Sequence, residues 1–172
     1  MAPEGAPRGA RAEAALSTLA LPALDRFLTY RLHLLSKLSD RHTAEAYASE
    51  LDLPLGEARC LAAIGSFAPL SVNDLAARAN LNKGQASRAA QALVDRGHVH
   101  KLASTVDSRG VVLTLTESGE RRFTQLMGII ASRNDAIFGC LNTAEQQVLG
   151  SLLDRLIQHV RMGVPNSPSP GV

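Results

Sequence analysis

The chain has 172 residues, of which 45% are hydrophobic and 3% aromatic, and its formal net charge at pH 7 is +2. This length supports one domain, or one domain built of two lobes, and the near-neutral charge does not by itself indicate a nucleic-acid-binding protein. The two cysteines, Cys60 and Cys140, exclude a disulfide framework, so we expect a reduced cytoplasmic protein. No stretch has the length and apolar character of a signal peptide core or a membrane span.

Residues 1–20 are rich in Ala, Gly, Pro and Arg and are expected to form a disordered arm. From Pro22 to about Ala48, helical spacing places apolar residues on one side and predicts a long helix that opens at the proline. The apolar members are Leu24, Phe27, Leu28, Leu34, Leu35 and Leu38. A helix of more than 20 residues is long for a small domain, so we expect half of a dimer interface.

The next segments predict three short helices. The first covers about 53–67, with Leu61 and Ile64 facing inward, and the second begins at Ser71 with Asp74 in a capping-box-like start. Asn82 is a suitable N-cap for the third helix, about 83–96, which is apolar on one side and ends at Gly97. The apolar members of that helix are Ala86, Ala89, Ala90, Leu93 and Val94.

Residues 98–115 are the strand-like region, with arms at about 99–103 and 111–115 around a polar, turn-rich connection. Thr116 caps a helix to about Cys140, with an apolar side of Phe123, Leu126, Met127, Ile130, Ile137 and Phe138. The run from Asn142 to Gln146 begins a last helix, whose apolar members are Val148, Leu149, Leu152, Leu153, Leu156 and Val160. That stripe is too continuous for one small domain to cover and predicts the other half of the dimer interface.

The predicted fold class is mainly α with a small β-wing. A winged helix-turn-helix lobe at about 53–115 and dimerisation helices at about 22–48 and 116–163 make one domain, 21–163. Residues 164–172 are expected to be a disordered Pro/Ser tail. Positive charge concentrates in 78–109, which carries +4 from six basic and two acidic residues. A localised phosphate-binding face explains this distribution, and an ordinary solvated surface is the alternative.

At the strand pair the sequence resembles the multiple-antibiotic-resistance regulator (MarR) family. The resemblance rests on Leu93-x-x-x-Gly97-x-Val99, then Asp107-x-Arg109, then a Leu-Thr pair and Gly119. It implies a homodimeric winged-helix transcription regulator, usually a repressor, that releases double-stranded operator DNA when a small aromatic or organic acid binds. One departure is Ala58, which stands where the family often has an aromatic residue lining the ligand pocket.

The helix at 83–96 is expected to enter the major groove with its N-terminal half. Gln85 can pair with adenine, and Lys83 or Arg88 can reach guanine or phosphate. The remaining candidate contacts on this helix are Asn82, Ser87 and Gln91. An intrahelical pair with Asp95, or a packing role, is the alternative for Arg88. Two copies in a two-fold dimer imply a pseudo-palindromic operator with half-site centres roughly 10 bp apart.

In the turn of the wing, Arg109 is the strongest candidate, because an arginine gains from the negative potential of a narrow minor groove. Asp107 is expected to hold the Arg109 guanidinium in place by a fork-like pair. A hairpin turn with two solvated charges is the alternative.

For the effector, Arg31 and His42 stand on the apolar side of the first helix, where a charged group needs a partner. An acidic ligand would supply one, with Tyr30 and Arg41 as further candidates. An intersubunit salt bridge to Asp154 or Glu145 is the alternative for Arg31, and an ordinary interface histidine is the alternative for His42.

Three other classes of function are weighed. A thiol-based redox-sensing repressor on the same fold needs an accessible, low-pKa cysteine, whereas Cys60 follows an apolar stripe. An enzyme is not expected, because the sequence shows no group of catalytic residues and no glycine-rich phosphate-binding loop. The five histidines have no further ligands at metal-binding spacing. We therefore predict no cofactor. A winged helix used only for protein contacts fits poorly with the basic residues at 83–109.

Overall fold

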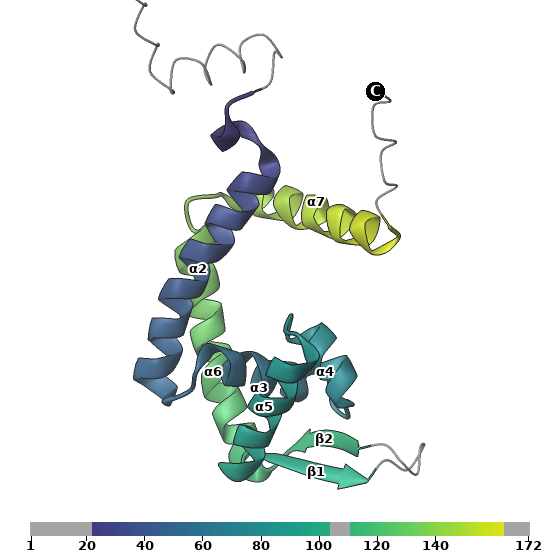
Figure 1. Cartoon of the computed structure of the whole chain (residues 1–172). Helices are drawn as coiled ribbons and strands as arrows, with labels where there is room; N and C mark the ends of the chain where they lie inside the picture. Colours follow the sequence, from purple (N-terminus) through teal and green to yellow (C-terminus); the bar gives the residue numbers. More distant parts are fainter. Residues whose placement is uncertain (1–21, 104–110, 164–172) are drawn as a thin grey trace, which may run out of the picture. The chain divides into compact units, whose positions relative to one another are not determined.

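The computed structural model describes residues 22–103 and 111–163. The chain divides into two compact units, Met1–Leu55 and Gly56–Val172, and Figure 1 shows their elements. The expected N-terminal arm, the C-terminal tail and the turn of the wing lie outside the described residues.

The first unit holds a 3₁₀ turn, η1 (Leu24–Arg26), followed by one long helix, α2 (Leu28–Leu51). The predicted helix start at Pro22 is wrong. Phe27 has an extended backbone, with φ −71° and ψ 131°, and this interrupts the helix after the 3₁₀ turn. At the other end, α2 passes the predicted Ala48 and stops where Asp52 adopts a left-handed conformation, with φ 52°. The 24-residue helix is about 36 Å long.

The second unit contains a three-helix lobe: α3 (Leu55–Phe67), which begins at the unit boundary, α4 (Val72–Arg78) and α5 (Lys83–Asp95). Its core side chains are almost completely inaccessible; they include Leu61, Ile64, Leu75, Leu93, Leu113 and Leu126. Leu61 and Ile64 therefore face inward as predicted. Three buried alanines on α5, Ala86, Ala89 and Ala90, are short enough to let this helix lie close to α4.

Two antiparallel strands, β1 (Val99–Ala103) and β2 (Val111–Leu115), follow α5. They pair from Val99 opposite Leu115 to Ala103 opposite Val111, and Figure 1 shows them as the two arms of one hairpin. Leu70 also pairs with Leu113, its N–H and C=O both bonding that residue at 3.3 and 2.9 Å. The connection between α3 and α4 is thereby fixed to the middle of β2.

Two helices complete the unit: α6 (Glu117–Phe138) and α7 (Thr143–Arg161). On α6, Leu126 is buried as predicted, but Ile129 is buried and Met127 is 39% exposed, so the predicted apolar side is partly wrong. A Cβ on Gly65 would overlap the ring of Phe123, so glycine at this position lets α3 and α6 approach closely. None of the residues of α7 is buried within the chain.

Candidate nucleic-acid interface

The N-terminus of α5 is fixed by a reciprocal capping box. The side-chain oxygen of Asn82 accepts the backbone N–H of Gln85 at 2.8 Å, and the side-chain oxygen of Gln85 accepts the backbone N–H of Asn82 at 3.1 Å. Each side chain satisfies a backbone donor that the helix itself leaves unpaired. The predicted N-cap is confirmed, and the box determines where the helix begins.

The outward side of α5 is polar along its first nine residues. The apolar residues of the helix face the core, while the predicted contact residues are exposed: Asn82, Lys83, Gln85, Ser87, Arg88 and Gln91. These six side chains come from ten consecutive residues, a rise of about 14 Å. The structure therefore exposes all six predicted residues around the solvent side of α5; their role in binding stays a prediction.

The side chain of Gln85 serves the capping box and is also the predicted contact to adenine. Pairing with N6 and N7 of adenine in the major groove uses the side-chain oxygen as acceptor and the side-chain amide as donor. That oxygen already accepts the N–H of Asn82 in the capping box. An amide oxygen can accept two hydrogen bonds, so the capped side chain keeps one acceptor position and its N–H donors for a base.

Arg88 makes no ion pair with any residue in 22–103 or 111–163. The alternative pairing with Asp95 is not observed, because Asp95 accepts a hydrogen bond of 2.8 Å from the side-chain amide of Gln91. The Nη1 atom of Arg88 lies back over the first turn, 3.5 Å from the place where a Cβ of Gly84 would stand. The guanidinium thus lies near the end of the helix that is expected to meet DNA.

The wing candidates Asp107 and Arg109 lie outside the described residues. On β1, His100 and Lys101 are exposed, and Leu102 is 49% exposed. Val99, by contrast, is buried at 3% exposure, so β1 joins the core at its first residue.

Thr116 connects the end of α5 to the start of α6, a contact that the sequence did not reveal. Its hydroxyl donates to the carbonyl oxygen of Gly97 at 2.7 Å and accepts the N–H of Gly119 at 2.9 Å. The backbone N–H of Thr116 bonds the carbonyl oxygen of His98 at 3.0 Å. This network holds the base of the hairpin to both helices.

His98 is half-buried in that network, with Nδ1 3.2 Å from the hydroxyl oxygen of Ser118. Burial lowers the pKa of His98, and the nearby charges of Arg122 and Arg96 lower it further. The imidazole is therefore mainly neutral at pH 7 and adds little to the positive charge of this region.

Cys60 is completely buried, and burial, followed by the negative charge of Glu57, raises the pKa of its thiol to about 11. Glu57 lies 3.2 Å from Nε of Arg96, an ion pair between α3 and the C-cap of α5. The interpretation of Cys60 as a packing residue is supported. Cys140 is exposed, with its sulfur 4.0 Å from the carbonyl oxygen of Ile137.

The effector candidates all lie on α2. Arg31 is exposed within the chain, and its Nε donates to the carbonyl oxygen of Asp25 at 2.8 Å; its expected acidic partner stays a prediction. Arg41 forms a 3.4 Å ion pair with Glu45. Tyr30 and Arg31 stand eleven residues before Arg41 and His42, about 16 Å along the helix. One small ligand on this helix can therefore reach only one of the two pairs.

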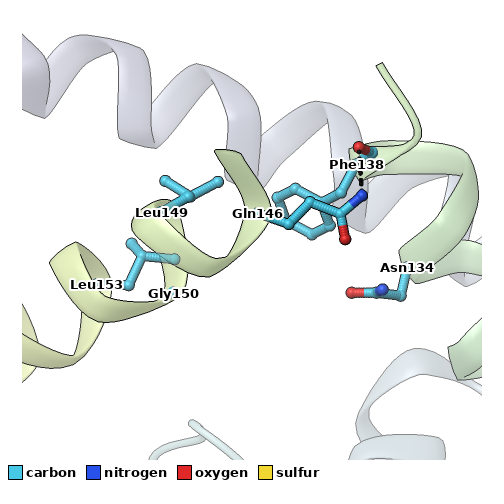
Figure 2. Close-up of a pocket in the computed structure, with 6 residues that line it drawn as sticks. All are labelled: Asn134, Phe138, Gln146, Leu149, Gly150 and Leu153. Atoms are coloured by element: carbon cyan, nitrogen blue, oxygen red, sulfur yellow. Dashed lines mark hydrogen bonds between the residues drawn. The ribbon is translucent and has the colours of Figure 1, made fainter. Parts of the chain in front are cut away.

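A cavity of about 200 Å³ lies where α6 meets α7. Figure 2 shows its lining, which is Asn134, Phe138, Gln146, Leu149, Gly150 and Leu153. The side-chain amide of Gln146 donates to the carbonyl oxygens of Phe138 and Leu141 at 3.2 and 3.0 Å, which fixes the turn between the helices.

The part of the chain that the structure describes holds no group of three His, Cys, Asp or Glu residues able to bind a metal. No helix within the described ranges combines the length and apolar character needed to cross a membrane.

Comparison with known proteins gives one consistent result. The family model of the MarR family matches residues 51–110. The HTH-type transcriptional regulator BilQ of Clostridium symbiosum is 29% identical over 93 residues, which span 54% of this chain and 65% of that protein. The match thus covers less than two thirds of this relative.

Among solved structures, a MarR/EmrR family transcriptional regulator from Acinetobacter sp. ADP1 aligns with a TM-score of 0.75 and 21% identity, covering 82% of this chain and 99% of that chain. BpsR of Bordetella bronchiseptica, whose DNA binding is regulated by 6-hydroxynicotinic acid, aligns with a TM-score of 0.70 and 17% identity, covering 79% of this chain and 96% of that one. At these identities the two structures establish the fold.

A helix-turn-helix followed by a two-stranded wing and two long helices defines the winged-helix class of transcriptional regulators, and the matched proteins are regulators rather than enzymes. Within that class, the similarity points to the MarR family: its model matches residues 51–110, the part of the chain that holds α3, α4, α5 and β1.

Proposed function

We propose that this protein is a cytoplasmic, homodimeric DNA-binding regulator, most simply a repressor, that leaves a pseudo-palindromic operator when a small aromatic or organic acid binds. The observation that carries the proposal is the exposed polar face of α5. It gathers Lys83, Gln85 and Arg88 on a helix whose other side is buried and whose start is fixed by a capping box. Such a helix presents donors to base edges and phosphates at small entropic cost.

Selection of duplexes from a random library tests DNA binding. The expected product is a two-fold sequence with half-site centres roughly 10 bp apart. Fluorescence anisotropy on that duplex then compares the wild type with Arg88→Ala, which should bind about 5- to 150-fold more weakly, a loss of about 1–3 kcal/mol. Arg121→Ala is the matched control, because Arg121 is an exposed α6 arginine paired with Glu117. Failure of the wild type to enrich any sequence would refute the proposal.

The dimer is supported by apolar side chains that the single chain leaves exposed. On α2 they include Leu28, Leu34, Leu35 and Leu38, and on α7 they include Val148, Leu152, Leu156, Ile157 and Val160. Contiguous exposed apolar surface of this kind marks an interaction site, and two-fold dimers are the commonest assembly.

Sedimentation analysis tests the dimer. Leu152→Glu combined with Leu156→Glu should give monomers at micromolar concentration and abolish operator binding. Gln147→Glu, an exposed polar residue of α7, is the matched charge control and should stay dimeric. A dimeric double variant would move the interface away from α7.

The effector site is proposed at Tyr30 and Arg31. The Nη groups of Arg31 make no hydrogen bond to any described residue, so the two donors of its fork are available for a carboxylate. At the other pair, Arg41 is engaged by Glu45. The regulation of BpsR by a heteroaromatic acid makes 6-hydroxynicotinic acid a reasonable first probe.

Calorimetry with 6-hydroxynicotinic acid, salicylate and benzoate tests this site. Arg31→Ala should weaken binding of the acid at least about tenfold, about 1.4 kcal/mol for one charge-assisted contact, whereas Arg41→Ala should change it little. Equal affinities of the wild type and Arg31→Ala would exclude Arg31 as the anchor. A bound acid acts on DNA only if it prefers one arrangement of the two recognition helices over the other.

A further inference from the structure

Gly84 is the second residue of α5 and lies exposed between Lys83 and Gln85. Several other glycines have a reason within the fold. A Cβ on Gly65 or Gly119 would overlap a neighbour, and Gly97 and Gly163 have positive φ angles of 73° and 88°. Gly84 has neither property. The nearest atoms to its Cβ position are Nη1 of Arg88 and Oδ1 of Asn82, both at 3.5 Å, which is ordinary van der Waals contact.

An alanine would therefore fit at position 84 in the free protein, and alanine is a better helix former than glycine. The fold gains nothing from glycine at this position. The three side chains around it, Asn82, Gln85 and Arg88, are those proposed to meet DNA. Glycine in such a place is typical of close approach between the protein backbone and a ligand.

We propose that Gly84 is itself a contact position of the DNA interface, where the duplex lies too close to the helix backbone to admit a side chain. The inference rests on the proposed DNA-binding function. Arg88, one turn further on, places Nη1 of its guanidinium 3.5 Å from that Cβ position. The missing Cβ therefore allows the duplex and the arginine to meet above the first turn of α5.

Gly84→Ala tests this, and Gly56→Ala is the matched control. Gly56 is also the second residue of its helix, α3, and nothing lies within 4 Å of its Cβ position. Both variants should fold with a Tm about 1–3 °C above that of the wild type, because alanine favours the helix. On the duplex selected by the wild type, Gly84→Ala should bind at least about tenfold more weakly, and Gly56→Ala within about twofold.

Wild-type affinity for Gly84→Ala would overturn the inference, as would a lower Tm, because a lower Tm would show that the fold itself needs glycine there. Failure of the wild type to bind any duplex would instead refute the proposed function. A second measurement distinguishes a direct clash between the new side chain and the duplex from an indirect effect through Arg88. In an Arg88→Ala background, Gly84→Ala should still lower affinity; no further loss would show that Gly84 acts only through the arginine.

Discussion

Asn82 and Gln85 each hold the backbone N–H of the other, at 2.8 and 3.1 Å, and both are also proposed to meet DNA. The same two side chains therefore build the recognition helix and present it. An alanine at either position would weaken the helix and the contact together, since loss of an N-cap costs about 0.5–2 kcal/mol. Substitutions that keep the cap and change only the outward chemistry are needed to separate the two roles.

Gln85→Glu makes that separation. A glutamate at this position still accepts the N–H of Asn82, as Glu145 does for Asn142 at the start of α7, at 2.8 Å. The variant should unfold at the same urea concentration as the wild type, or slightly above it, because a carboxylate also suits a helix N-terminus. It should bind the selected duplex at least about tenfold more weakly, because it loses the amide donor and brings a negative charge toward phosphates.

The matched control is Glu145→Gln, which exchanges the same groups in the other capping box, away from α5. It should leave DNA affinity unchanged. Wild-type affinity in Gln85→Glu would show that the glutamine serves the cap alone.

Arg109 is the wing residue expected to enter the minor groove. Arg109→Ala should weaken operator binding by about 1–3 kcal/mol, because the variant loses a guanidinium from the region of strongest negative potential. Gel-shift titration against Arg121→Ala measures the effect. If Arg109→Ala binds as tightly as that control, the wing has no part in affinity.

The thiols give a test of redox sensing. A thiol of pKa about 11 is ionised in roughly one molecule per thousand at pH 8, and Cys60 is also inaccessible. Ellman's reagent should therefore react with one thiol per native chain, that of Cys140, and with two after unfolding. In Cys140→Ser, peroxide should leave DNA binding unchanged. Rapid reaction of two native thiols would restore the redox-sensing alternative.

Local signals account for what the sequence predicted well. Ser71, Asn82, Thr116 and Asn142 each cap a helix as expected, because a cap depends on residues three positions apart. The buried alanine side of α5 likewise follows from helical spacing alone. From these features the sequence predicts the order of helices and strands in a winged helix and the exposed side of α5 that carries the candidate contacts.

The predictions that failed concern contacts between segments, which residue spacing within one segment does not determine. The pairing of Leu70 with Leu113 joins residues 43 positions apart, and no periodic pattern surrounds Leu70. Which α6 residues are buried depends on the elements packed against it, so Ile129 was missed and Met127 wrongly included. The environment predicted for Arg31 depends on a dimer interface, which the single chain does not contain; within the chain Arg31 is exposed.

His98 makes stability depend on pH in a defined direction. Its pKa is lowered below the ordinary value of 6.5 by burial, and then by Arg122 and Arg96. The unfolded chain therefore takes up a proton at a higher pH than the native protein does. The stabilising contribution of the neutral imidazole is fully present above about pH 6.5, declines as the pH falls from there toward the folded pKa, and is lost below it.

Urea unfolding of the wild type between pH 7.5 and 5 should show this decline, and His98→Gln should reduce it, because glutamine has no proton to bind and can still bond the hydroxyl of Ser118. His159→Gln removes an exposed histidine of α7 and serves as the control, expected to keep the wild-type slope. If the free energy of unfolding falls with pH equally in the wild type and in His98→Gln, another group sets the acid sensitivity of the fold.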